Sequence, residues 1–84
     1  LESLGGNRMI NILYFASLKE ATKRDSEQLD AAGKTVSELK AMIMERHSIT
    51  LDGAMTAVNE EFTDEETVLN EMDTVAFIPP VSGG

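Results

Sequence analysis

Cysteine is absent from this sequence of 84 residues, and a small domain without disulfides has to hold together by packing alone. The absence fits the cytoplasm, where a disulfide framework would not persist, and we expect the protein to act there. It also excludes a cysteine nucleophile and any zinc or iron–sulfur site ligated by cysteine.

Long apolar runs and an excess of positive charge are missing as well. The longest apolar runs, 12–16 and 75–80, are the length of a strand and far short of the ~20 residues that a membrane span needs. Fifteen acidic residues against seven Lys and Arg give a net charge of −8. We therefore expect neither nucleic acid nor a membrane as a partner. The acidic excess either steers the protein toward a basic docking surface or only keeps it in solution.

Side chains that could form a catalytic centre or a metal site are few. His47 is the only histidine, and it stands in no motif with a nucleophile or an acid. The acids within 60–66 lack the spacing and the central glycine of a calcium loop, so a solvated charge run is the better interpretation. We expect no metal and no permanently bound cofactor, and an independent enzyme is the least favoured class.

A chain of 9.2 kDa is long enough for one domain. Residues 1–8 match nothing around them and lack the basic and apolar regions of a signal peptide. We interpret them as a disordered, vector-derived extension ahead of Met9. The predicted domain spans residues 9–80, and residues 81–84 are expected to form a flexible C-terminal tail.

The first predicted element is a strand. Residues 10–15 are rich in β-branched and aromatic side chains, and alternate residues of a strand share one face. Because Asn11 is polar, its face is predicted to be the outer one. Leu13 and Phe15, on the same face, are then exposed apolar residues.

The clearest local signal is the start of a helix at Thr35. Glu38, three residues later, completes a capping box with it. Apolar residues then recur at helical spacing and predict an amphipathic helix of about three turns that ends near His47. Two weaker segments precede it: residues 17–22 predict one or two helical turns, and residues 26–30 predict a second strand.

The C-terminal half predicts further strands. Residues 55–59 form one, a turn at 60–61 leads to a short return at Phe62, and the last strand covers 74–78. Two prolines stop that strand, because proline donates no hydrogen bond to a ladder. One helix that covers a small mixed sheet makes an α+β domain of four to five strands. With the first and last strands side by side at its centre, this is the β-grasp layout.

The end of the chain carries the one motif with a chemical use. Two prolines stiffen the exit from the sheet, and the four residues after them span ~13 Å at ~3.3 Å each. Gly83 and Gly84 have no Cβ and can pass through a narrow channel, so that a partner enzyme could reach and activate the terminal carboxylate. A terminal Gly-Gly alone is a weak signal, since Gly5-Gly6 is another in the same chain.

From Met9 to Gly84 the chain resembles the small subunit of molybdopterin synthase, the MoaD family of ubiquitin-like sulfur carriers. The resemblance covers the whole expected domain. It is carried by the strand start at 9–16, by Ala57-Val58-Asn59, and above all by D-T-V-A-F-I-P-P-V-S-G-G at 73–84. Related carriers for thiamine synthesis share the Gly-Gly end and usually lack the Phe-x-Pro-Pro lead-in.

The resemblance implies a chemistry for Gly84. An adenylyltransferase similar to the ubiquitin-activating enzymes would adenylate its carboxylate with ATP, and a persulfide donor would convert it to a thiocarboxylate. The tail would then insert into the large subunit of molybdopterin synthase, where sulfur passes to a pyranopterin precursor of the molybdenum cofactor. The residues expected to insert are Pro79, Pro80, Val81, Ser82 and Gly83. In such families two large and two small subunits form a heterotetramer, and the small subunit is a non-catalytic co-substrate.

An apolar patch on the outer sheet face is predicted to be the partner interface. Phe15, Phe62 and Ile78 would project from this face near the tail, where ubiquitin-like proteins dock their partners. Phe62 could instead belong to the core.

Other functions stay open at this point. The chain could carry sulfur for another pathway of the thiamine type, or act as a ubiquitin-like modifier attached to lysines. It could also be a β-grasp binding module whose terminal glycines are incidental. Removal of Gly83 and Gly84 separates these classes, because only a carrier or modifier would lose its function.

Overall fold

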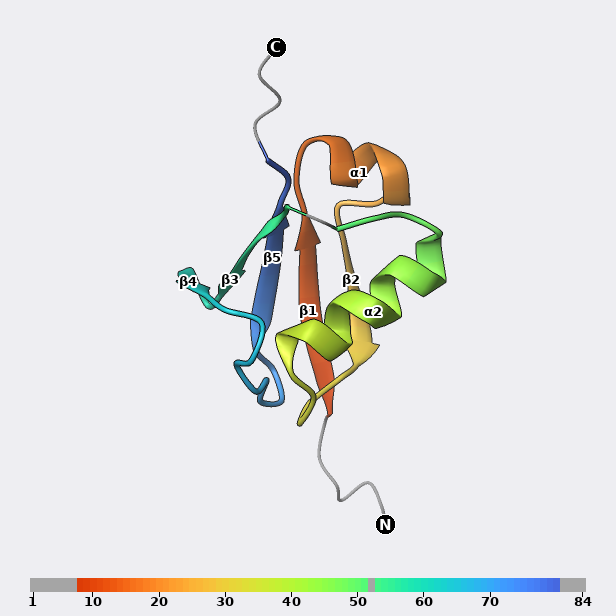
Figure 1. Cartoon of the computed structure of the whole chain (residues 1–84). Helices are drawn as coiled ribbons and strands as arrows, with labels where there is room; N and C mark the ends of the chain where they lie inside the picture. Colours follow the sequence, from red (N-terminus) through yellow and green to blue (C-terminus); the bar gives the residue numbers. More distant parts are fainter. Residues whose placement is uncertain (1–7, 52, 81–84) are drawn as a thin grey trace.

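The chain folds into a five-stranded sheet that a helix crosses on one face (Figure 1). A computed structural model describes residues 8–51 and 53–80. The elements are β1 (Met9–Tyr14), α1 (Ser17–Thr22), β2 (Ser26–Asp30), α2 (Val36–His47), β3 (Met55–Val58), β4 (Glu61–Thr63) and β5 (Thr74–Ile78). The strand order is β2-β1-β5-β3-β4, with β1 and β5 parallel and the other neighbours antiparallel. The predicted β-grasp layout is confirmed, including its central pair of strands.

Both helices end at a left-handed residue, and α2 begins with the predicted capping box. The Thr35 hydroxyl accepts a hydrogen bond from Glu38 N at 3.2 Å, and Thr35 N donates to Glu38 Oε1 at 2.9 Å. α2 ends at His47, as predicted, because Ser48 turns to φ 56°. α1 ends in the same way at Lys23. In the described ranges, neither helix has the length and apolarity to cross a membrane.

The core lies between the helices and one face of the sheet. Ile10 and Ile12 of β1 and Phe77 of β5 are fully buried, and Leu39 and Ile43 of α2 belong to the same cluster. Residues of β1 alternate between this buried face and a half-buried one, as the sequence predicted. Since both helices contribute to this one core, neither of them covers the second face of the sheet within residues 8–51 and 53–80 (Figure 1).

Arg8 corrects the predicted domain boundary. Its carbonyl accepts a hydrogen bond from Ala32 N at 3.1 Å, and its guanidinium donates to the Ala32 carbonyl at 2.9 Å. Its Nε also lies 3.8 Å from the Asp30 carboxylate. Arg8 is therefore part of the folded domain, because backbone pairing continues past β1. The prediction for residues 1–7 falls outside the described residues.

A buried carboxylate joins three elements of the core layer. Glu27 faces inward from β2, and its side chain is 2% exposed. The Tyr14 hydroxyl donates to Glu27 Oε2, and His47 Nε2 lies 2.7 Å from the same oxygen. Arg24 and Arg46 each place a guanidinium nitrogen 3.3 Å from Oε1. Burial of an acid is tolerated here because both of its oxygens have partners.

These contacts set the ionisation of the Glu27 carboxyl. Burial alone would raise its pKa, but the hydrogen bonds with Tyr14 and His47 and the charges of His47 and Arg24 outweigh burial and hold the pKa below its ordinary value of 4.5. Burial and the contact with Glu27 together raise the pKa of the Tyr14 hydroxyl. Because folding lowers the pKa of Glu27, its contribution to stability is complete above pH 4.5 and is lost as the pH falls through the folded pKa.

Replacement of the buried carboxylate should therefore destabilise the domain. We expect Glu27→Gln to lower the free energy of unfolding by ~3 kcal/mol at neutral pH, because the groups around Glu27 lose their anion. Urea denaturation measures this change. Glu45→Gln, at an exposed position of α2, is the matched control, with an expected change within ~0.5 kcal/mol.

The same two variants show how much of the loss of stability in acid is due to Glu27. The unaltered chain and Glu45→Gln should both lose stability as the pH falls below 4.5, and Glu27→Gln should lose less over that range. An equal acid loss in all three proteins would contradict the role assigned to Glu27.

Candidate functional site

The last strand leads directly into the segment that the sequence marks as functional. β5 ends at Ile78, which pairs with Met55 of β3. Gly53, at φ 81°, brings the loop before β3 close to the proline exit, since a Cβ on Gly53 would lie 3.5 Å from Pro80 Cγ. Pro80 thus leaves the sheet against the backbone of this loop. Residues 81–84, for which the sequence predicts a flexible tail, lie outside the described residues.

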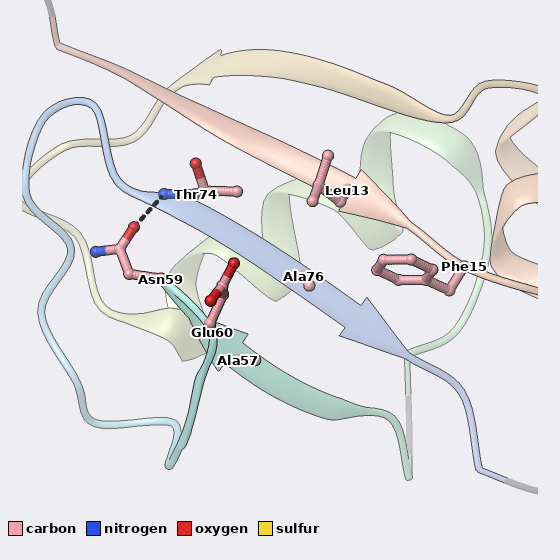
Figure 2. A pocket seen from close by; sticks show the side chains of 7 residues that line it. All are labelled: Leu13, Phe15, Ala57, Asn59, Glu60, Thr74 and Ala76. Atoms are coloured by element: carbon pink, nitrogen blue, oxygen red, sulfur yellow. Dashed lines mark hydrogen bonds between the residues drawn. The ribbon is translucent and has the colours of Figure 1, made fainter.

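The uncovered face of the sheet is hollowed across β1, β5 and β3 (Figure 2). Register pairs Leu13 of β1 with Ala76 of β5, and Ala76 with Ala57 of β3. These three side chains line a hollow of about 430 Å³, with Phe15 at one end. The hollow exists because two of the three floor positions are alanines, whose single methyl groups leave space between larger neighbours.

The three predicted interface residues lie on this face, although not at one place. Phe15 is 45% exposed. Because Tyr14 pairs with Phe77 in the parallel ladder, the next residues, Phe15 and Ile78, lie level with each other at the end of the two strands. Ile78 itself is half-buried. Phe62 is 66% exposed on the edge strand β4, opposite Ala57, so the alternative that it belongs to the core is wrong.

Met55 is an exposed apolar residue that the sequence analysis did not select. Its side chain is 49% exposed, and it pairs with Ile78 beside the tail exit. The alternation of β3 is weak in the sequence, so its faces become clear only from its pairing with β5. We call Phe15, Ile78 and Met55 the tail-end patch.

The other end of the hollow is polar and is formed by a two-residue turn. Asn59 and Glu60 link β3 to β4 with left-handed φ values of 52° and 74°, one residue earlier than the turn predicted at 60–61. Asn59 adopts this conformation readily and holds the turn in place. Its Oδ1 accepts from Thr74 N at 3.0 Å, and its Nδ2 donates to Asp73 Oδ1 at 2.9 Å. The Glu60 side chain reaches over β5 toward the hollow (Figure 2).

Charge is divided unequally along the chain. Residues 1–46 contain all seven Lys and Arg together with seven acids, and are neutral overall. Residues 47–84 contain eight acids and no Lys or Arg. Because the second segment includes β3, β4 and β5, the whole net charge of −8 belongs to the half of the sheet that carries the tail. This half presents a negative field to any partner.

The described residues contribute few groups for chemistry of their own. Across residues 8–51 and 53–80, no group of three His, Asp or Glu is arranged to hold a metal ion. His47 is engaged with Glu27 on the covered side of the sheet, away from the hollow. What the arrangement offers is an exposed apolar surface beside the end of β5.

Comparison with known proteins identifies close relatives of the chain. The model of the ThiS family matches residues 12–84. A molybdopterin synthase sulfur carrier subunit from Dictyostelium discoideum is 33% identical, over 93% of this chain and 99% of the relative. A protein of the same name from Escherichia coli is also 33% identical, over 90% of this chain and 100% of the relative.

Solved structures agree with the fold. A complex of subunits 1 and 2 of molybdopterin-converting factor from Helicobacter pylori contains a chain that matches with a TM-score of 0.67 and 25% identity, over 90% of this chain and 99% of that one. The small archaeal modifier protein SAMP1 from Haloferax volcanii matches with a TM-score of 0.77 over 90% of this chain and 99% of its own. At 22% identity the second likeness concerns the fold alone.

The turn at the polar end of the hollow should depend on the Asn59 side chain. We expect Asn59→Ala to lower the free energy of unfolding by ~2 kcal/mol, because two hydrogen bonds are lost and alanine disfavours a left-handed backbone. Chemical denaturation checks this. Asn70→Ala removes an exposed amide that makes no side-chain hydrogen bond within the described residues, and it should change little. Equal effects of the two variants would show that Asn59 does not hold the turn.

Proposed function

The chain belongs to the ThiS family, and we propose that it carries sulfur on the C-terminal carboxyl of Gly84 for molybdopterin synthesis. The path of β5 is the observation that carries this proposal. The strand lies at the centre of the sheet, between β1 and β3, and runs directly into the two prolines that precede the tail. Relatives that match most of this chain are named molybdopterin synthase sulfur carrier subunit, which favours this pathway over others.

The proposed loading of sulfur takes place in three balanced steps. A carboxylate oxygen of Gly84 attacks the α-phosphorus of ATP. Pyrophosphate is the leaving group, and the product is an acyl-adenylate. The terminal sulfur of a donor persulfide attacks the acyl carbon, and AMP leaves. A thiol then attacks the donor's sulfur in the resulting acyl disulfide, forming a new disulfide, and the thiocarboxylate departs with the electrons of the broken bond.

The proposed delivery of sulfur restores the carrier. Inside the large subunit of molybdopterin synthase, the thiocarboxylate sulfur bonds to a carbon of the pyranopterin precursor as a carbon–oxygen bond at that carbon breaks, and the oxygen leaves with the bonding electrons and a proton. Water cleaves the acyl–sulfur bond and returns the Gly84 carboxylate. Two such deliveries build the dithiolene that later holds molybdenum. We propose that the inserted segment consists of Pro79, Pro80, Val81, Ser82 and Gly83. An extended chain of this length can enter the large subunit, and its glycine end is narrow because it has no Cβ.

The large subunit is the proposed docking partner of the uncovered face. The Helicobacter pylori structure is described as a complex of subunits 1 and 2 of molybdopterin-converting factor, which supports an equivalent pair here. The tail-end patch and Phe62 are apolar and exposed or half-buried, as residues of an interface core are before docking. We propose a heterotetramer of two large and two small subunits, with the tail of this chain in the large subunit's active site.

The remaining proposed partners supply the chemistry that the carrier lacks. They are an adenylyltransferase similar to ubiquitin-activating enzymes and a persulfide sulfur donor. Both would act in the cytoplasm, where a domain without cysteine folds independently of the redox state. The carrier serves as a co-substrate, and general acid–base groups are left to its partners.

Intact-mass measurement tests this proposal. The protein is incubated with ATP, the adenylyltransferase of the molybdopterin pathway and a persulfide donor, with a thiol present. We expect the mass gain of one oxygen replaced by sulfur, and no gain in a variant that lacks Gly84. Circular dichroism and thermal unfolding of the shortened variant should match the unaltered chain, because Gly84 lies beyond the last strand.

A second known carrier from the same pathway serves as the positive control for the enzymes. If that carrier is charged and the unaltered chain is not, the proposed function is wrong. A gain that persists without Gly84 would place the sulfur elsewhere on the chain and would also refute the proposal.

A further inference from the structure

Glu60 occupies a backbone position that favours glycine. Two-residue turns with two left-handed residues prefer Asn-Gly, because glycine carries no Cβ that clashes at positive φ. The chain has Asn59 at the first position and Glu60, at φ 74°, at the second. The left-handed backbone disfavours any residue with a Cβ at this position, and the glutamate found there is therefore strained.

The Glu60 carboxylate is exposed and directed over the hollow. The side chain lines the hollow together with Thr74 and points from the β3–β4 turn toward β5 (Figure 2). Within residues 8–51 and 53–80, this carboxylate has no hydrogen bond and no ion pair. Glu27 differs in this respect, since both of its oxygens are engaged. A cation for Glu60 cannot come from residues 48–84, which contain no Lys, Arg or His.

The shape of the hollow fits a long side chain with a charged end. Its floor is apolar at Leu13, Ala57 and Ala76, and its far end carries the Glu60 carboxylate. From Ala76 to Thr74 along β5 is two residues, or about 6.6 Å, close to the length of an extended lysine or arginine side chain. Both side chains place their methylene stems on apolar surface and keep the charge at a polar end.

We propose that the hollow receives a Lys or Arg side chain from the protein that docks on this face. The inference rests on the proposed function, in which the large subunit is that protein. The methylene stem would lie on Leu13, Ala57 and Ala76, and the charge would meet Glu60. The negative half of the sheet would draw the same basic residue in during approach. An apolar side chain in the hollow is the weaker alternative, since it would leave Glu60 without a partner beside a buried surface.

Binding to the large subunit of molybdopterin synthase, measured by surface plasmon resonance with the full chain, tests this inference. Glu60→Gln keeps the size of the side chain and removes its charge. Glu61→Gln removes the same charge from the next residue, which does not line the hollow. We expect Glu60→Gln to weaken binding at least about tenfold, mainly through faster dissociation, because a paired charge inside the interface is lost. Glu61→Gln should change only the association rate and its salt dependence.

A third variant separates binding from folding. Glu60→Gly suits the left-handed backbone, so we expect a higher midpoint of thermal unfolding together with weakened binding. Weakened binding by a more stable protein would exclude misfolding as its cause.

Two results would overturn the inference. If Glu60→Gln and Glu61→Gln weaken binding equally, or if Glu60→Gly binds as tightly as the unaltered chain, Glu60 meets no cation. The proposed function would still stand, provided that both variants acquire the thiocarboxylate mass. If the unaltered chain does not bind the large subunit, the proposed partner and this inference are wrong together.

Discussion

The parallel pairing of β1 with β5 sets the position of every other part of the molecule. Tyr14 pairs with Phe77, so both strands end at the same edge of the sheet, and Phe15 lies level with Ile78 where the tail begins. A parallel pair requires a crossover connection, and here the chain between the two strands supplies it with a helix that packs on one face. Among the described residues, no helix covers the other face, which adjoins the end of β5 (Figure 1). The uncovered face and the strand end that leads into Pro79 and Pro80 are thus adjacent because of a single strand pairing.

Two glutamates on opposite faces of the sheet show how differently one residue type is used. Glu27 is buried, both of its oxygens have partners, and its pKa is lowered, so it contributes to the stability of the domain. Glu60 is exposed, occupies a strained position and has no partner in the described residues. The first carboxylate completes the fold, and the second is available to another molecule. This contrast is the physical basis for assigning structure to one face and recognition to the other.

Much of the fold could be predicted because its signals are local. The capping box at Thr35 marks the main helix, and the alternation of 10–15 distinguishes the two faces of the sheet. The inward position of Glu27 was not predicted, because an acid in a short strand is normally exposed. The one signal for it is the apolar Leu29 two residues later, which shares the buried face of the strand. The hollow also depends on register, because it needs Ala57 and Ala76 on neighbouring strands. The prediction of the tail's chemistry rests on its composition and on the resemblance to a family.

Transfer of labelled sulfur measures the central claim most directly. The chain is charged at Gly84 with heavy-isotope sulfur, freed of its loading enzymes, and mixed with the large subunit and the pyranopterin precursor in a single turnover. The carrier role predicts that the labelled sulfur appears in the dithiolene product while the mass of the chain returns to that of the carboxylate. Product that contains only unlabelled sulfur, or a chain that keeps its label while product forms, would contradict that role.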